Sequence, residues 1–261
     1  TRKESSAASD VYKRQDLICV GTATQTEVKE QIDLMYSLIH QQVDAIVLVP
    51  IDSKALVQPA VEAVRKGIPV INIDIQLDAQ LLEQAGVEVA FVGPDNFAAA
   101  YEVGKLLGKK LRNEDKVAII EGLAAADNAQ QRKRGFIKAI EEKGLRLVAS
   151  EPADWETEKA AEVFQAMWMR YPDLKAVYCS NDAMALGVLQ QMQEKKCYLP
   201  VVGFDNDAVM KEFLSTGKLV ATADIFSSQM AVRGIEFALD VLEGRIENRG
   251  VHSTAYEIIK Q

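Results

Sequence analysis

The stretch that decides the fold runs from Ala176 to Asp205 and reads AVYCSNDAMALGVLQQMQEKKCYLPVVGFD. It begins with a short apolar run, continues with apolar residues at helical spacing from Ala183, and ends with a second apolar run that stops at Asp205. A strand, a helix and a strand at this spacing form a βαβ unit, and such units build parallel sheets. The stretch therefore predicts an α/β fold.

Polar side chains follow both strands of this unit. Asn181 stands at the end of the first strand and Asp205 at the end of the second. Because ligands of open parallel sheets bind outside the carboxyl ends of the strands, both residues are candidate ligand contacts. Asn and Asp are also preferred helix N-caps, and helical patterns follow both residues, so capping stands as the alternative for each.

The same alternation of strands and helices continues over most of the chain. Further apolar runs that predict strands occupy residues 16–21, 44–50, 70–74, 87–92, 116–122, 145–149, 219–223 and 255–259. The first of these is interpreted as a buried strand, and Asp74 closes the run 70–74 as Asp205 closes the later one. These strands are too many for one compact sheet. We therefore expect two doubly wound parallel sheets, with a boundary near Pro94-Asp95.

Composition and charge exclude several classes of function. The net charge of −8 argues against a nucleic-acid surface, because phosphate binding needs clustered Lys and Arg. Cys19, Cys179 and Cys197 lack metal-like spacing, and we interpret them as small buried hydrophobic residues. His40 and His252 lie in no catalytic context, and no phosphate loop or nucleophile elbow is present. We expect neither an enzyme nor a bound metal or cofactor.

Residues 1–15 are polar, rich in Ser and Ala, and without periodicity. They lack the apolar core of a secretory signal, and no run in the chain approaches the roughly 20 apolar residues of a membrane helix. We expect residues 1–15 to be a disordered tail or a foreign junction.

Several short motifs occur in an order that is informative about the protein family. They are PVINID at 69–74, QRKRGF with Arg132 at 131–136, PADW ending at Trp155, NDAMALG at 181–187 and VVGFD at 201–205. The last two are the most specific. In this order they resemble the sugar-binding proteins of bacterial ABC transporters, in the branch typified by ribose-binding protein. The resemblance covers nearly everything after residue 15.

The resemblance implies a periplasmic binding protein-like fold of type I, in which two similar lobes joined by three crossings enclose a ligand at a hinge. It implies a first lobe of residues 16–94 plus 226–249 and a second lobe of residues 95–225 plus 250–261. Asp95, Asn96 and Ile225 would lie at the hinge.

The ligand contacts implied by the resemblance are Asp74, Arg132, Trp155, Asn181 and Asp205. Their chemistry suits a sugar, because carboxylates and amides pair with adjacent hydroxyls, Arg adds a fixed fork of donors, and Trp offers a flat apolar face. A plainer interpretation exists for each. Arg132 could be a solvated helix residue, Trp155 could pack in the core, and Asp74 could cap the segment after it.

The sequence departs from the family pattern at three places. The strand and helix that precede the equivalent of Asp16 in family members are absent, which should leave an apolar gap and half of a binding wall. Ile75 stands where ribose binders carry Arg, and Ile225 stands where they carry Gln, although the adjacent Asp224 is a candidate substitute. We therefore expect a deoxy sugar or a less polar polyol rather than ribose.

The function implied by the resemblance is that of a monomeric receptor, periplasmic or otherwise extracytoplasmic, that closes around a monosaccharide or related polyol. A membrane permease of an ABC-type import system would then recognise the closed form. The alternative is the ligand-sensing domain of a LacI-like transcriptional repressor, which resembles the same fold. Residues 1–15 cannot form the helix-turn-helix that such repressors carry before the first lobe.

Overall fold

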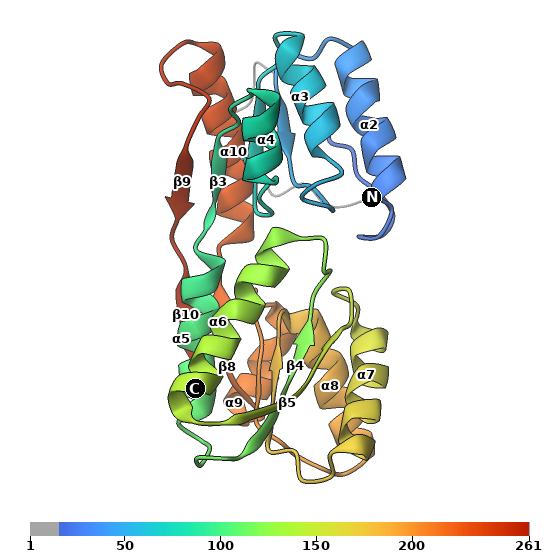
Figure 1. Cartoon of the computed structure of the whole chain (residues 1–261), viewed down its shortest axis with the longest axis vertical. Helices are drawn as coiled ribbons and strands as arrows, with labels where there is room; N and C mark the ends of the chain where they lie inside the picture. The colour runs from blue at the N-terminus through green and yellow to red at the C-terminus, as the bar shows by residue number, and fades with distance from the viewer. Residues whose placement is uncertain (1–15, 261) are drawn as a thin grey trace.

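The computed structural model describes residues 16–260 and divides them between two lobes, each built on its own sheet (Figure 1). The predicted α/β architecture with two sheets is confirmed. The prediction made for residues 1–15 lies outside the described residues. Among residues 16–260, no helix combines the length and apolar character needed to cross a membrane.

The first lobe holds a four-stranded parallel sheet in the order β1-β2-β3-β9. Its strands are β1 (Ile46–Leu48), β2 (Val70–Ile73), β3 (Phe91–Pro94) and β9 (Val251–Thr254), and its helices are α2 (Val28–His40), α3 (Val57–Arg65), α4 (Ala79–Ala85) and α10 (Ser227–Leu242). Ile71 and Ile73 pack with the α10 side of the sheet, whereas Val70 packs with α2, α3 and α4. Helices therefore cover both faces, as a run of buried strand residues predicts.

The second lobe holds a six-stranded sheet in the order β10-β8-β7-β6-β4-β5, in which only β10 is antiparallel. Its strands are β4 (Lys116–Glu121), β5 (Arg146–Pro152), β6 (Ala176–Cys179), β7 (Val201–Val202), β8 (Leu219–Asp224) and β10 (Glu257–Lys260). Its helices are α5 (Asn96–Gly108), α6 (Asp127–Lys143), α7 (Thr157–Arg170), α8 (Asp182–Glu194), the short 3₁₀ turn η1 (Ala208–Met210) and α9 (Lys211–Ser215). Helices α5 and α6 pack on one face, and α7, α8 and α9 pack on the other.

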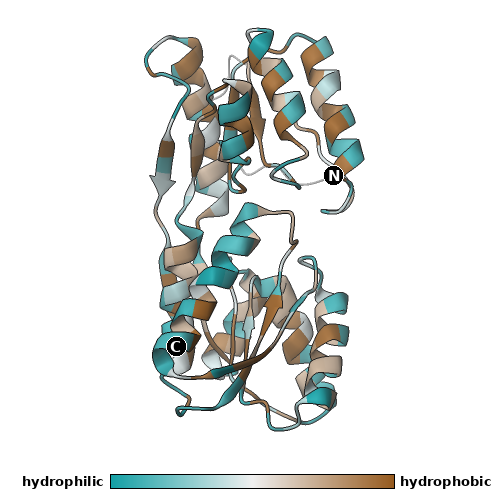
Figure 2. Ribbon diagram, in the orientation of Figure 1, coloured by the Kyte–Doolittle hydropathy of each residue, from teal (hydrophilic) through white to brown (hydrophobic). Residues whose placement is uncertain are grey.

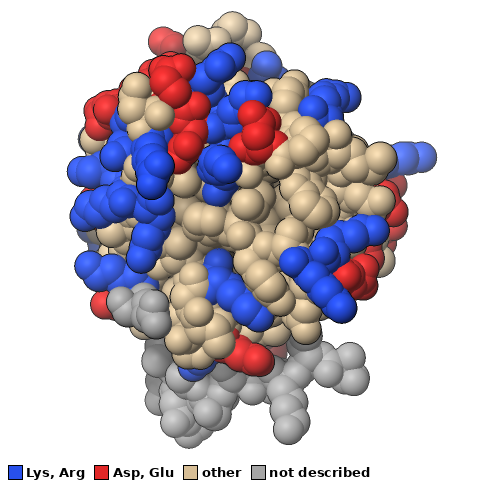
Figure 3. Space-filling view, turned by 90° about the horizontal axis from the view of Figure 1, so that it is seen from below, with Lys and Arg blue, Asp and Glu red and all other residues tan. Residues whose placement is uncertain are grey.

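Figure 2 shows apolar residues concentrated on the strands and on the helix sides that face them. The end of the second lobe shown in Figure 3 carries many Lys and Arg side chains, with Asp and Glu among them. Such a mixed surface is typical of solvated faces, and burial of the apolar sides of the helices drives the folding of each lobe.

The chain crosses between the lobes at three places: from β3 to α5, from β8 to α10, and from β9 to β10. Asp95 and Asn96 lie at the first crossing and Ile225 at the second, where the hinge is predicted. The expected lobe boundary at residue 250 needs correction, because Val251–Thr254 pairs in parallel with Phe91–Pro94 of the first sheet. The last crossing therefore lies after Thr254.

The expectation of a buried strand at residues 16–21 is wrong. The segment forms no strand, its side chains are exposed, and Leu17 is 61% exposed. Cys19, which we expected to be buried, is exposed with it, whereas Cys179 is buried and Cys197 half-buried. An apolar run becomes a strand only where a neighbouring strand completes its backbone hydrogen bonds, and no described strand pairs with this segment.

Asp182, the first residue of α8, is a fully buried acid that organises the loop around Asp205. Its Oδ1 accepts a hydrogen bond from the Thr222 hydroxyl at 2.9 Å, and its Oδ2 accepts one from the backbone N–H of Asp207 at 2.9 Å. Gly203 permits this approach, since a Cβ there would lie 2.0 Å from Asp182 Oδ1. These contacts hold Asp205 at a φ of 109°, a conformation that persists only where its surroundings impose it.

This buried acid predicts that stability falls as pH rises. Burial raises the pKa of Asp182 to about 7, so the folded protein keeps a proton that the unfolded chain releases above about pH 4. The resulting stabilisation is complete below that pH and is lost as pH approaches 7. We expect Asp182 to contribute a fall of about 2 kcal/mol in the free energy of unfolding between pH 5 and pH 8, measured by urea unfolding as the difference between wild type and Asp182→Asn.

Asp182→Asn, which mimics the protonated acid, should reduce this pH dependence. Asp33→Asn changes an exposed acid on α2 and should leave the slope as it is in the wild type. Identical slopes for all three proteins would contradict the assignment.

Candidate ligand-binding site

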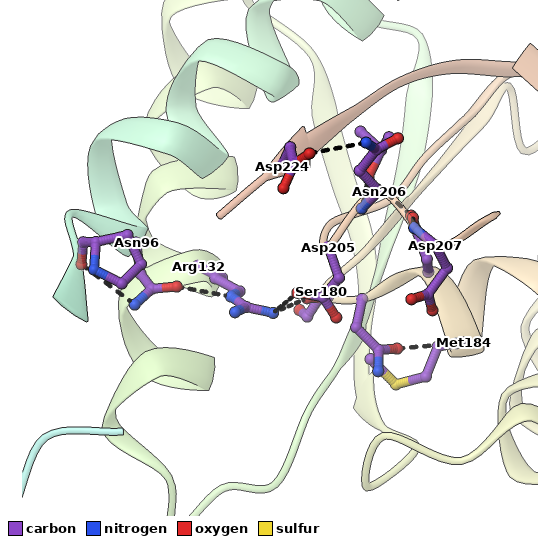
Figure 4. Close-up of polar contacts among 12 residues, drawn as sticks. Asn96, Arg132, Ser180, Met184, Asp205, Asn206, Asp207 and Asp224 are labelled. Atoms are coloured by element: carbon purple, nitrogen blue, oxygen red, sulfur yellow. Dashed lines mark hydrogen bonds and ion pairs between the residues drawn. The ribbon is translucent and has the colours of Figure 1, made fainter. Parts of the chain in front are cut away.

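Arg132 is the centre of the candidate site. It is 3% exposed and lies on the buried face of α6, four residues before Phe136. Its Nε donates to Asn96 Oδ1 at 2.9 Å, and its Nη1 donates to the backbone carbonyl of Ser180 at 2.9 Å (Figure 4). The same Nη1 lies 3.4 Å from Asp205 Oδ1. The guanidinium is thus held by fixed partners within the second lobe.

Two aromatic rings flank this guanidinium. Its central carbon lies 3.8 Å from the ring centroid of Phe204 and 5.5 Å from that of Trp155. Trp155 is 7% exposed and packs in the core of the second lobe, where Gly122 makes room for its indole. Core packing and proximity to the candidate site therefore both apply to Trp155.

Asp205 of the second lobe and Asp74 of the first lobe both lie near Arg132. Burial raises the pKa of Asp205 to about 8, Arg132 opposes this rise, and Asp182 and Asp74 add to it. Burial likewise raises the pKa of Asp74, which follows β2 of the first lobe, and Arg132 again opposes the rise. Because the charge of Asp74 acts on Asp205 and that of Arg132 acts on both acids, the structure brings these three predicted site residues together.

Asn181 and Asp224 both make local hydrogen bonds. Asn181 Oδ1 accepts from the backbone N–H of Met184 at 2.8 Å, so the residue caps α8 and presents its amide N–H₂ as its remaining polar group. Asp224 Oδ1 accepts from the backbone N–H of Phe226 at 2.8 Å, and its Oδ2 accepts from Asn206 Nδ2 at 2.9 Å (Figure 4). Both oxygens of Asp224 thus brace the second crossing.

The predicted hinge residues differ in what they contact. Asp95 caps α5 by accepting from the backbone N–H of Ala98 at 2.8 Å. Asn96 is buried and orients Arg132, which links the first crossing directly to the candidate site. Ile225 is 3% exposed and packs in a core cluster that both lobes share.

Sequence reasoning missed two residues that join the lobes. The backbone N–H of Ser53 donates to the Ala125 carbonyl at 3.0 Å, and the Ser53 hydroxyl accepts from the backbone N–H of Asp127 at 2.9 Å. Asn128, 4% exposed, lies near Asp74 and lowers its pKa against the larger effect of burial. No local motif marks either residue, because each contact joins segments far apart in the sequence.

A cavity of about 630 Å³ lies beside this contact, which is a size typical of small-molecule sites. It is lined by residues 52–55 and 76–80 of the first lobe and by residues 124–127 and Gln130 of the second. Asp74, Arg132 and Asp205 are not among its lining residues. Within residues 16–260, no group of His, Cys, Asp and Glu side chains is arranged to hold a metal ion.

Comparison with known proteins identifies relatives with similar sequences and similar structures. The chain is 40% identical to the D-ribose/D-allose-binding protein of Pseudomonas aeruginosa over 251 residues, which cover 94% of this chain and 79% of that protein. Its structure is similar to that of an ABC transporter solute-binding protein from Burkholderia multivorans, with a TM-score of 0.92, 38% identity, and coverage of 97% and 92% of the two chains.

A second similar structure is an ABC transporter periplasmic solute-binding protein from Actinobacillus succinogenes with bound D-allose. The TM-score is 0.89, the identity is 31%, and the match covers 97% of this chain and 90% of that one. The sequence profile of the periplasmic binding protein domain matches residues 5–246. The chain therefore belongs to the periplasmic binding protein domain family.

Proposed function

We propose that this protein is the sugar-binding receptor of an ABC-type carbohydrate import system and closes its two lobes around a monosaccharide. The observation that carries the proposal is the convergence of Asp74 from the first lobe with Arg132 and Asp205 from the second. The sugars named for its relatives from P. aeruginosa and A. succinogenes, ribose and allose, support the ligand class.

The polar groups of this site suit a polyhydroxylated ligand. Arg132 donates hydrogen bonds and accepts none, while the carboxyl oxygens of Asp74 offer acceptors. Asp205, whose pKa burial raises to about 8, keeps a proton at neutral pH in the absence of ligand and can both donate and accept. A sugar hydroxyl is also both donor and acceptor, so adjacent hydroxyls match this set, while Phe204 and Trp155 pack around the Arg132 guanidinium and limit its movement.

Closure follows from where these groups are attached. Asp74 belongs to the first lobe, and Arg132 and Asp205 belong to the second, so a ligand contacts all three only when the lobes are shut. A ligand shifts a conformational equilibrium by its difference in affinity for the two states. Sugar binding therefore favours the closed form, and a permease that recognises that form responds to the loaded receptor alone. An extracytoplasmic location fits this role.

The site offers less charge than the ribose-binding pattern. Ile75, which stands in place of the Arg of that pattern, is 6% exposed and packs against the core cluster of the second lobe. One polar contact to the ligand is thereby replaced with an apolar one. We propose that a deoxy sugar or a less polar polyol binds at least as well as D-ribose, and competition between them tests this point.

Arg132→Lys and Asp205→Ala should each weaken binding of the preferred sugar at least tenfold, because each removes a hydrogen-bonding group from an enclosed site. The measurement is a thermal-shift screen with D-ribose, D-allose, deoxy sugars and polyols, followed by calorimetric titration of the best ligand. Lys138→Ala, an exposed change on the same helix α6, is the control and should bind as the wild type does. Equal affinities in all four proteins would refute the site assignment.

Ser53→Ala should weaken all sugars by a similar factor, about fivefold. The hydroxyl caps α6 from the other lobe, so we expect the contact to depend on how close the lobes are, and a lost cap costs about 1 kcal/mol. Ser53→Thr, which keeps a hydroxyl, should restore most of the affinity. Unchanged affinities in Ser53→Ala would show that this contact does not stabilise closure.

A further inference from the structure

Three buried polar atoms around the interlobe site have no hydrogen-bond partner: Asp74 Oδ1, Asn128 Oδ1 and Trp155 Nε1. Two of them are acceptors and the third is a donor. They come from the turn after β2 of the first lobe, from α6, and from the loop before α7. Since buried polar atoms are nearly always paired, a cluster of exceptions from separate elements indicates a ligand that pairs them.

The amide oxygen is the free atom of the Asn128 side chain, because it is buried and has no hydrogen-bond partner. Asn128 lies close enough to Asp74 to lower the pKa of that acid, so both residues border the same site. A hydroxyl on the ligand is the donor that this oxygen lacks.

A local structural role does not explain the buried side chain. Asn128 is the second residue of α6, a position from which side chains can help to cap a helix. Its oxygen makes no such bond, and the N-cap residue Ala126 supplies no side-chain cap either. The cap comes from Ser53 of the other lobe, so α6 does not need the Asn128 side chain for this purpose.

We propose that Asn128 is a further ligand-contacting residue and determines specificity for one hydroxyl of the bound sugar. Its Oδ1 accepts a hydrogen bond from that hydroxyl. This inference rests on the proposed function, because it assigns a residue to the same sugar site. A site built to pair a particular hydroxyl discriminates strongly against the analogue that lacks it, since its own polar atom is then left buried and unpaired.

An apolar replacement of Asn128 should have different effects on the stability of the ligand-free protein and on ligand binding. Without ligand, an unpaired buried oxygen is destabilising, so an apolar side chain of similar size is tolerated or preferred. With ligand, the same replacement removes a hydrogen bond. A residue with a merely structural role would change stability in the absence of ligand and would affect every ligand alike.

The test compares wild type, Asn128→Leu and a matched control, Gln190→Leu, which replaces an exposed amide on α8. Calorimetric titration is carried out with whichever of D-ribose and D-allose binds more tightly, and with each of its monodeoxy analogues. Thermal unfolding without ligand is measured in parallel. We expect Asn128→Leu to unfold at the wild-type temperature or above it and to bind the parent sugar at least tenfold more weakly.

The decisive comparison is among the deoxy analogues. One analogue, which lacks the hydroxyl that Asn128 pairs, should bind wild type and Asn128→Leu equally, while the others lose the same factor as the parent sugar. Three results for Asn128→Leu would contradict the role of Asn128 while leaving the proposed function intact. These are wild-type affinity for the parent sugar, an equal loss of affinity for every analogue, and unfolding at a lower temperature than the wild type. A wild-type protein that binds no monosaccharide overturns the proposed function itself, and the inference with it.

Discussion

The burial of the Arg132 guanidinium is the constraint on which the rest of the structure depends. A cation that is 3% exposed loses nearly all of its hydration, and such burial is tolerated only where fixed groups replace the lost water. Asn96 and the Ser180 carbonyl accept its N–H groups, and the face of Phe204 lies against it. The two acids nearest to its charge, Asp205 and Asp74, follow strands of different lobes.

The second lobe therefore holds Arg132 and Asp205 in fixed positions, and the first lobe adds Asp74 to the site. The N-terminal part of α6 meets the first lobe directly, through Ser53 at Asp127 and through Asp74 at Asn128. Asp74 has a φ of 63° and Asp205 a φ of 109°, unusual backbone conformations at two site residues that belong to different lobes. Strain of this kind is found where the surrounding contacts impose a particular side-chain direction. Binding is thereby coupled to the relative position of the lobes.

Much of the fold could be predicted from the sequence, because alternating apolar runs and helical patterns leave few architectures open. The positions of Asp74 and Asp205 after strands likewise placed both at the ligand-binding edge of a parallel sheet. The segment 16–21 shows the limit of such reasoning, since strand character in a sequence does not say whether a partner strand lies beside it. The residues that join the lobes were missed for a related reason. Ser53 and Asn128 have partners that no local pattern reveals, and for Asn181 capping and ligand contact coexist in one side chain.

The most direct test of the central claim is a crystal structure of the protein grown with D-allose. The account predicts one monosaccharide enclosed between the lobes, with hydroxyl oxygens within hydrogen-bonding distance of Asp74 from the first lobe and of Arg132 and Asp205 from the second. A sugar bound elsewhere, or one that contacts residues of a single lobe only, would contradict it.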